Sequence, residues 1–372
     1  MSQQFTIDGS DALESHLAAT GARVLAGVKS LVPATKLEGL LLGGGYGRGE
    51  GGVLKTTAGD QPYNDLEFYV FIRGNAILAE RKFRQPLHEL GEKLSPEAGL
   101  EVEFKVLTLD KLRRSAPSMF YYDLVAGHRC LLGDDALLAG CEHHRDASMI
   151  PLHEATRLLM NRCSGLLYAA ERLARANFGE GEKDFVGRNL AKSELTFGDV
   201  LLAANGQYHW SCRERHARLT RLVCLEDLPM TKLVWQHASG VEFKLHPKRT
   251  TESRETLAAR HAELSELGKI LWLWLETKRL KTKFASPRDY AFSERNLCPE
   301  TSALRNRLVN FRAFGTSDLA CERYPRERLF RALALLLWER TELEKVRSEL
   351  RTDATDFAGL VSAYENLWKR FN

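Results

Sequence analysis

The sequence has no apolar run long enough to span a membrane and no closely paired cysteines. Its longest apolar stretches, KILWLWLE and RALALLLWE, are far shorter than the roughly 20 residues that cross a bilayer. The seven cysteines are odd in number, and none has the C-x-x-C spacing of a zinc or redox site. The first residues, MSQQFTIDGSD, lack a basic start followed by an apolar core. We therefore expect a cytoplasmic protein with no disulfide framework, no zinc site and no membrane partner.

A strong charge of either sign is also missing. The net charge is +4, and charged residues make up 27% of the 372 residues. Hydrophobic residues make up 44%, which is typical of a globular protein with a well-buried core. This composition disfavours disorder over most of the chain. It also disfavours a strongly cationic substrate, which would need an acidic site.

The pattern of apolar residues changes near Pro151. Residues 1–150 alternate helical and strand-like segments, the strand-like ones being LEGLLLGG, DLEFYVFIR and LEVEFKVLTL. From Pro151 onward the spacing is almost entirely helical. Helices are predicted at residues 75–94, 151–178, 186–205, 253–282 and 325–351 and over the last dozen residues, with an irregular connection at 285–302. We predict an α+β fold, with a mixed sheet and helices in residues 1–150 and an all-α helical bundle in residues 151–372.

Seven glycines fall within the twelve residues LLGGGYGRGEGG, at positions 41–52. Glycine weakens helices and strands, so this concentration indicates that the backbone approaches something closely. Residues 47–52 match the dinucleotide-binding pattern G-x-G-x-x-G, but that pattern must open a helix. The residues that follow, VLKTTAGDQPYN, have no helical period, and no P-loop motif is present. Neither of these two phosphate-binding motifs therefore accounts for the glycines.

Acidic residues lie on two predicted strands after the glycine stretch. In YNDLEFYVFI the side chains alternate between faces, so Asp65 and Glu67 point the same way, about 7 Å apart along the chain. In LEVEFKVLTL, Glu101, Glu103 and Lys105 share a face. Carboxylates on one face of a buried strand repel each other, and a divalent cation removes that cost. We predict a metal site of Asp65, Glu67 and Glu103, with Glu101 as the alternative third acid; a solvated face of an edge strand is the competing interpretation.

This combination resembles the DNA polymerase beta-type nucleotidyltransferase superfamily, in particular small bacterial members in which a helical bundle follows the catalytic domain. The resemblance rests on a glycine-rich turn after a strand, D-x-E on the next strand, a third acid and the segment LLGDD at residues 131–135. It covers roughly residues 10–140. It implies that an acceptor hydroxyl attacks the α-phosphate of an NTP, with ATP expected, and that pyrophosphate leaves. The acceptor, whether a small molecule, a protein or a tRNA, stays open, as does the oligomeric state.

Carried over to this chain, the resemblance assigns catalytic and metal-binding roles to Asp65, Glu67 and Glu103, which would hold two magnesium ions. Glu103 would also accept the proton of the attacking hydroxyl. Gly44 and Gly45 would form the turn that holds the triphosphate. We expect a side chain at Gly45 to block the nucleotide without unfolding the chain.

Three cations are candidates for contacts with the nucleotide. The superfamily usually has Gly-Ser in the turn, whereas this chain has Gly-Gly; Arg48 can replace the serine by gripping phosphate with two hydrogen bonds. Arg162 falls inside the apolar stripe of its helix, so it needs either a carboxylate of the bundle or a phosphate. Lys192, on the following helix, is the candidate for the outer phosphates by analogy with two-domain relatives. The rival interpretation is a nucleotide-sensing or partner-binding module on a degenerate fold without turnover.

Overall fold

The computed structural model of the protein describes residues 4–134, 136–223, 225, 227–316 and 320–372. The chain forms two compact units. The first contains Met1–Pro151, Asn205–Leu222 and Ala238–Lys248. The second contains Leu152–Ala204, Val223–His237 and Arg249–Asn372. The change of unit at Pro151 falls where the sequence pattern changes, whereas residues 205–222 and 238–248 group with the first unit and not with the helical one.

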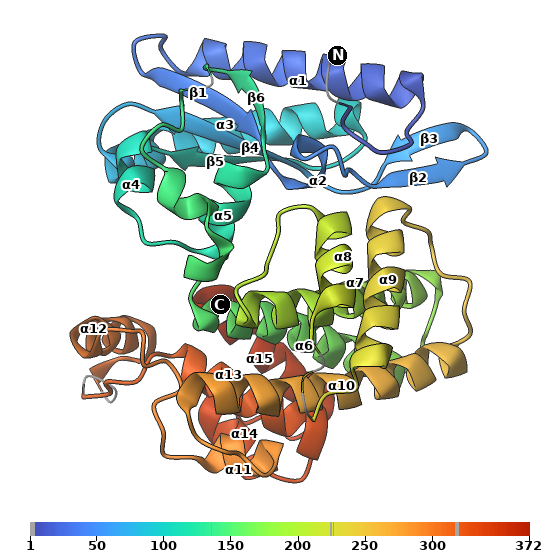
Figure 1. Ribbon diagram of the computed structural model, residues 1–372. Helices are drawn as coiled ribbons and strands as arrows, with labels where there is room; N and C mark the ends of the chain where they lie inside the picture. Colours follow the sequence, from blue (N-terminus) through green and yellow to red (C-terminus); the bar gives the residue numbers. More distant parts are fainter. Residues whose placement is uncertain (1–3, 135, 224, 226, 317–319) are drawn as a thin grey trace. The chain divides into compact units, whose positions relative to one another are not determined.

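A mixed four-stranded sheet lies in the first unit (Figure 1). Its strands are β1 (Leu37–Leu42), β4 (Leu66–Ile72), β5 (Val102–Leu107) and β6 (Arg129–Leu132). The order across the sheet is β5-β4-β1-β6, with β4 and β5 parallel and β1 antiparallel to both of its neighbours. The three predicted strands are confirmed. The fourth, β6, enters the LLGDD segment, of which Asp135 lies outside the described residues.

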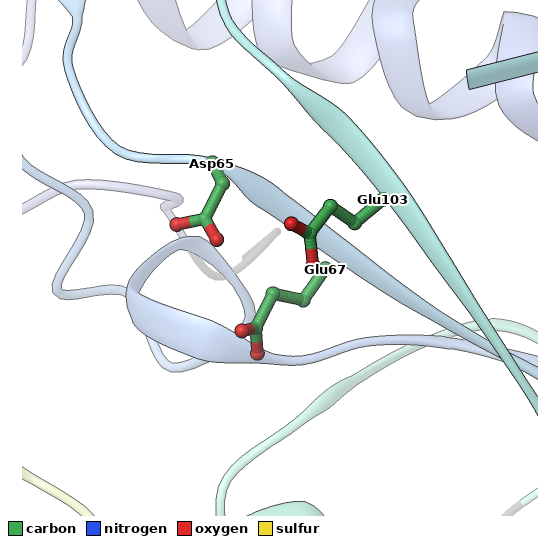
Figure 2. A group of neighbouring side chains, drawn as sticks. All are labelled: Asp65, Glu67 and Glu103. Carbon is green, nitrogen blue, oxygen red and sulfur yellow. The ribbon is translucent and has the colours of Figure 1, made fainter. Parts of the chain in front are cut away.

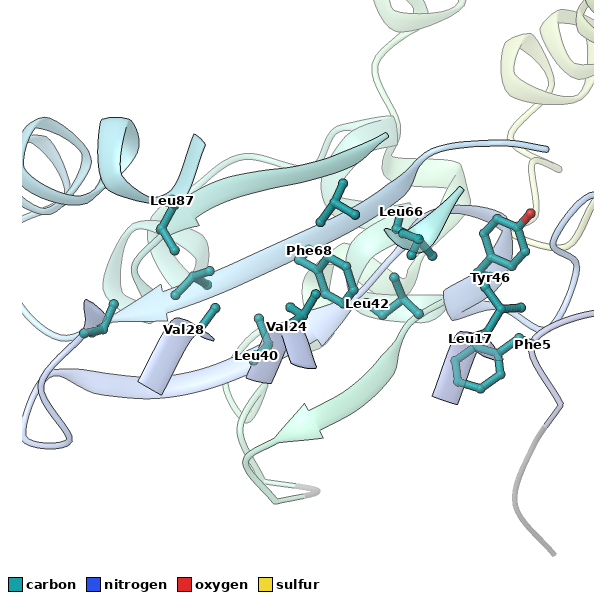
Figure 3. Close-up of a cluster of buried hydrophobic side chains, with 14 of the residues drawn as sticks. Phe5, Leu17, Val24, Val28, Leu40, Leu42, Tyr46, Leu66, Phe68 and Leu87 are labelled. Atoms are coloured by element: carbon teal, nitrogen blue, oxygen red, sulfur yellow. The ribbon is translucent and has the colours of Figure 1, made fainter. Parts of the chain in front are cut away.

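One face of the sheet packs against two long helices, α1 (Asp11–Leu31) and α3 (Ala76–Ala98). The contact is a cluster of buried apolar side chains that includes Val24 from α1, Phe68 from β4 and Leu87 from α3 (Figure 3). The helical spacing of the apolar residues in α1 and α3 and the period of two in the strands bring these side chains to one side. This cluster forms the larger apolar core of the first unit.

The opposite face of the sheet packs against α4 (Leu109–Arg114) and α5 (Met119–Ala126). Leu41 of β1 and Phe71 of β4 point into this second cluster. Because side chains alternate along a strand, Glu67 shares the face of Phe71. The acidic residues of β4 therefore lie on the α5 side of the sheet, away from α1 and α3.

Shorter elements connect the strands of the first unit. The glycine stretch forms a single helical turn, α2 (Gly44–Gly47), and the residues after it form a hairpin. The remaining elements of this unit are β2 (Val53–Thr56), β3 (Gly59–Pro62), η1 (Glu142–Arg145), η2 (Ala147–Met149), α8 (Cys212–Arg221) and the second part of α9 (Met230–Leu245). The hairpin agrees with the absence of a helical period after the glycines.

In the second unit, the regular elements of the described residues are all helices. Its elements are α6 (Leu152–Ala174), α7 (Glu180–Ala204), the first part of α9, α10 (Arg254–Leu280), α11 (Pro287–Phe292), α12 (Ala303–Phe314), α13 (Arg326–Ala334), the π-helical segment η4 (Leu335–Glu339), α14 (Leu343–Leu350) and α15 (Phe357–Phe371). The single helix predicted at 325–351 is wrong, because Arg340 adopts a left-handed φ of 51° and divides it. The segment 285–302 is likewise not wholly irregular, since it contains α11.

The fold is thus α+β, as predicted, with a small mixed sheet and many helices. Among the described residues, no helix combines the length and the apolar character that are needed to cross a membrane.

Candidate functional site

Three carboxylates converge where β4 and β5 begin (Figure 2). Asp65 directly precedes β4, and the parallel register pairs Glu67 of β4 with Glu103 of β5. Each of the three residues offers an oxygen within 4.8 Å of the others. Asp65 is exposed, and the other two side chains are half-buried. Glu101, the alternative third acid, is not part of this cluster.

The cluster has the electrostatic character of a cation site. Burial raises the pKa of Glu103, and the neighbouring Asp65 carboxylate raises it further. Hard carboxylate oxygens are the donors that magnesium prefers, and it commonly takes one or two of them together with phosphate oxygens. The donor set therefore fits magnesium, and its residues would be Asp65, Glu67 and Glu103.

The glycine turn lies directly beside Glu67. The backbone N–H of Gly43 donates to the Glu67 carbonyl oxygen at 2.9 Å. Gly44 has a φ of +61°, and a Cβ built on it would lie 3.6 Å from Glu67 Oε2. The left-handed backbone, which side chains disfavour, explains a glycine at this position. The structure thus brings together the predicted turn and the predicted metal ligands.

Other glycines of the stretch are explained by packing of the chain against itself. A Cβ on Gly47 would lie 2.1 Å from the carbonyl oxygen of Leu42. A Cβ on Gly45 would lie 2.9 Å from the carbonyl oxygen of Glu50. Both neighbours are backbone atoms, which cannot rotate away. The expectation that a side chain at Gly45 leaves the fold intact is therefore wrong, because it would displace the backbone at Glu50.

A pocket of about 190 Å³ opens beside the turn. Its lining includes Gly43, Gly44 and six side chains from the turn, β4, β5 and α5, namely Arg48, Glu67, Tyr69, Lys105, Phe120 and Asp123. Two cations, two carboxylates and two aromatic rings thus face a space next to the carboxylate cluster. Of these six, only Arg48 and Glu67 were predicted from the sequence to contact a nucleotide or a metal.

Lys105 and Tyr69 both contact Glu67. Lys105 Nζ lies 3.7 Å from Glu67 Oε1, and Tyr69 Oη donates to Glu67 Oε2 at 2.9 Å. The same ammonium group lies 5.7 Å and 5.6 Å from the ring centroids of Tyr69 and Phe120. The sequence placed Lys105 on the face of Glu103, but its position in the pocket depends on the pairing of β5 with β4. The sequence signal that could have identified Lys105 is its spacing of two residues from Glu103, which places both side chains on one face of the strand.

Arg48 is buried, with a side chain that is only 10% exposed. Its Nη2 lies 3.0 Å from Asp123 Oδ2, and its Nη1 donates to the carbonyl oxygen of Trp210 at 3.0 Å. Burial alone would lower the pKa of Arg48, but the Asp123 carboxylate holds it above its ordinary value. In the described part of the chain, Arg48 Nε has no hydrogen-bond partner. These two contacts use two of the five N–H groups of the guanidinium, and the predicted two-bond grip on phosphate stays a prediction.

The two cations predicted in the helical half belong to the second unit. Arg162 Nε donates to Thr196 Oγ1 at 3.1 Å, and burial lowers the pKa of Arg162 while the nearby Asp199 carboxylate opposes this shift. Lys192 is exposed on α7. These contacts favour the interpretation in which Arg162 is balanced by a carboxylate of its own bundle. Contacts of either residue with a nucleotide stay predictions.

Comparisons of the chain with protein-family models, with curated proteins and with solved structures found no match.

Proposed function

We propose that the protein is a magnesium-dependent nucleotidyltransferase, which transfers NMP from an NTP to an acceptor hydroxyl and releases pyrophosphate. One observation carries this proposal: Asp65, Glu67 and Glu103 converge within 4.8 Å beside a glycine turn and a pocket that contains cationic side chains. Carboxylates that crowd in this way favour binding of a cation, and a bound cation together with nearby donors favours binding of phosphate. ATP is the expected NTP.

The residues of the site take the following roles in the proposal. Bound magnesium would neutralise charge on the phosphates and make the acceptor hydroxyl easier to deprotonate. A Glu103 carboxylate oxygen accepts the hydroxyl proton as the acceptor oxygen bonds to the α-phosphorus and the bond to pyrophosphate breaks. Lys105 supplies positive charge near the phosphates, and Tyr69 orients Glu67.

A second space could admit the acceptor to the carboxylate cluster. A groove of about 870 Å³ runs along α3 and the start of β5, and Glu103 is part of its lining. The carboxylate cluster therefore adjoins the small pocket through Glu67 and the groove through Glu103. In the proposal the nucleotide occupies the pocket side and the acceptor reaches Glu103 from the groove. A small molecule, a protein hydroxyl and a tRNA end all stay open as acceptors.

The proposal is tested with labelled NTPs, magnesium and cell lysate as the source of acceptors. We expect release of pyrophosphate and a labelled product, which mass spectrometry identifies. Asp65→Asn should abolish both, while Asp110→Asn, which changes an exposed acid of α4 outside the cluster, the pocket and the groove, should retain them. Calorimetry with Mn²⁺ on the same variants tests the metal site without an acceptor. Wild-type turnover and Mn²⁺ affinity in Asp65→Asn would refute the assignment.

The alternative is a nucleotide-binding module without turnover. The Gly-Gly turn, which lacks the serine of the superfamily, and the engagement of Arg48 by Asp123 favour it. This alternative predicts magnesium-dependent binding of NTP that Asp65→Asn weakens. It also predicts that no pyrophosphate is released with any fraction of the lysate.

A further inference from the structure

Helix α12 of the second unit turns an apolar stripe toward solvent. The side chains of Leu304, Leu308 and Phe311 are 71%, 52% and 43% exposed. With 3.6 residues per turn, these three positions fall within an arc of about 60° on the helix. Several large apolar side chains gathered on one exposed face mark a binding surface more often than scattered ones do.

The opposite side of α12 is polar and buried. Asn306 and Asn310 are at most 1% exposed. The Nδ2 of Asn306 donates to the carbonyl oxygen of Glu322 at 2.7 Å, and the Nδ2 of Asn310 donates to that of Arg323 at 2.8 Å. Hydrogen bonds to the backbone, and not burial of the apolar stripe, thus hold this face of α12 on its unit. The stripe faces outward because the two asparagines face inward.

Arginines flank the stripe on both sides. Arg305 and Arg312 follow one flank and Arg307 the other, and α12 contains no acidic residue. Arg307 pairs with Glu322. Within the described residues, neither Arg305 nor Arg312 has an ion-pair partner. As far as the described residues show, the helix therefore presents the positive charge of Arg305 and Arg312 next to exposed apolar side chains.

Two further arginines extend the positive charge at the C-terminal end of α12. The ring of Phe314 lies 4.6 Å from the guanidinium carbon of Arg351 and 5.9 Å from that of Arg370. Both arginines are exposed and come from outside α12. On the helical wheel Phe314 falls on the flank of Arg307, so positive charge continues beyond the helix on that side.

We propose that α12 binds an anionic lipid surface, with Leu304, Leu308 and Phe311 entering the interface and the arginines contacting the head groups. A second α12 would bring like charges together, and a nucleic acid would use the arginines but leave the stripe in water. An extended anionic membrane surface uses both features, since apolar side chains and nearby arginines each add to interfacial binding. This mode of binding does not need a helix that spans the bilayer, so the proposal departs from the expectation of no membrane partner, which rested on the absence of a spanning segment.

The test is co-sedimentation of the full chain with vesicles of phosphatidylcholine alone or with about 30% phosphatidylserine. We expect the protein to bind the anionic vesicles and not the neutral ones, and to be released by about 0.5 M NaCl. The double variant Leu308→Ser and Phe311→Ser should remain in the supernatant. Arg305→Gln and Arg312→Gln should each weaken binding by about five-fold.

Two matched controls distinguish binding through α12 from nonspecific binding through other exposed apolar or cationic side chains. Trp235→Ser changes a side chain that is 68% exposed in the same unit, and Arg249→Gln changes an exposed arginine outside α12. Both should bind like the wild type, and circular dichroism should show that every variant is folded. Equal binding to neutral vesicles, wild-type binding by the α12 variants, or no vesicle binding at all would overturn the proposal. The last result would point instead to an acidic protein as the partner of α12.

Discussion

The ammonium group of Lys105 lies 3.7 Å from the carboxylate of Glu67. A cation of the chain thus contacts one of the three acids proposed to hold magnesium. The same side chain lines the pocket proposed for the phosphates. The positive charge of Lys105 should therefore lower the affinity of the site for a metal ion and raise its affinity for a polyanion.

We expect Lys105→Met to bind Mn²⁺ more tightly and ATP more weakly. Because the side chain is 42% exposed, each change should be modest, roughly two- to five-fold. Calorimetry with Mn²⁺ alone, and then with ATP, measures both effects. Lys111→Met, which changes an exposed lysine on α4, is the control. Parallel changes of the two affinities in one direction would contradict the assigned position of Lys105.

Replacement by alanine should destabilise the protein to different extents at Gly44 and Gly47. Gly47→Ala should destabilise the first unit by at least about 3 kcal/mol, because its Cβ would lie 2.1 Å from the Leu42 carbonyl oxygen. Gly44→Ala should fold and lose only about 1–2 kcal/mol, the cost of a left-handed backbone. Urea denaturation followed by circular dichroism compares the two. Equal stability of Gly47→Ala and wild type would refute the packing explanation.

Glu50 should make the stability of the first unit depend on pH. This buried carboxylate accepts hydrogen bonds from Ser211 Oγ and from the Cys212 N–H, the latter at 2.8 Å. Burial alone would raise the pKa of Glu50, but these hydrogen bonds together hold it below its ordinary value. The stabilisation is therefore present above the unfolded pKa of about 4.5 and is lost as the pH falls through the folded pKa.

Glu50→Gln should accordingly cost about 1–3 kcal/mol near neutral pH, and this cost should shrink as the pH falls below about 4.5. Urea denaturation of both proteins between about pH 7 and about pH 3.5 measures the difference. Cys212 and Ser211 stay unchanged, so the variant alters only the acceptor. A difference that stays constant over the whole range would show that Glu50 has no lowered pKa.

The charge of Arg162 should be coupled to that of Asp199 within the second unit. Asp199 is 5% exposed, and its Oδ1 lies 3.0 Å from His237 Nε2. Asp199→Asn should cost up to about 3–5 kcal/mol, because it removes the carboxylate that compensates the charge of the half-buried Arg162. Adding Arg162→Met should restore part of this loss, with a coupling of about 0.5–3 kcal/mol in the double-mutant cycle. Strictly additive costs would mean that the two charges do not interact.

Lys192 tests whether the second unit takes part in nucleotide binding. If it contacts the outer phosphates, Lys192→Ala should weaken ATP binding roughly five-fold, the effect of about 1 kcal/mol, and leave AMP binding unchanged. Calorimetry with ATP and AMP measures this. Lys183→Ala, which changes another lysine of α7, serves as the control. Unchanged ATP affinity in Lys192→Ala would restrict the nucleotide site to other residues.

The periodicity of the sequence was enough to predict the α+β fold, three strands of the sheet and most of the long helices, although α9 was not predicted. It also placed Asp65 and Glu67 on one face, because a period of two is a local property of any strand. Boundaries were less predictable where the backbone departs from its average geometry. Arg340 interrupts a helix that the apolar pattern would continue, since its left-handed φ leaves no mark in that pattern.

The tertiary structure alone decided which residues meet. Strand order places β5 beside β4 in the register that pairs Glu67 with Glu103, and this selects Glu103 over Glu101 for the cluster. The tertiary structure likewise places Arg48 in an ion pair with Asp123. Such pairings depend on contacts between segments far apart in the chain, whereas periodicity reports only the face on which a side chain lies. For the same reason, the outward orientation of the apolar side of α12 depends on contacts such as the hydrogen bonds of Asn306 and Asn310 to the backbone of residues 322 and 323.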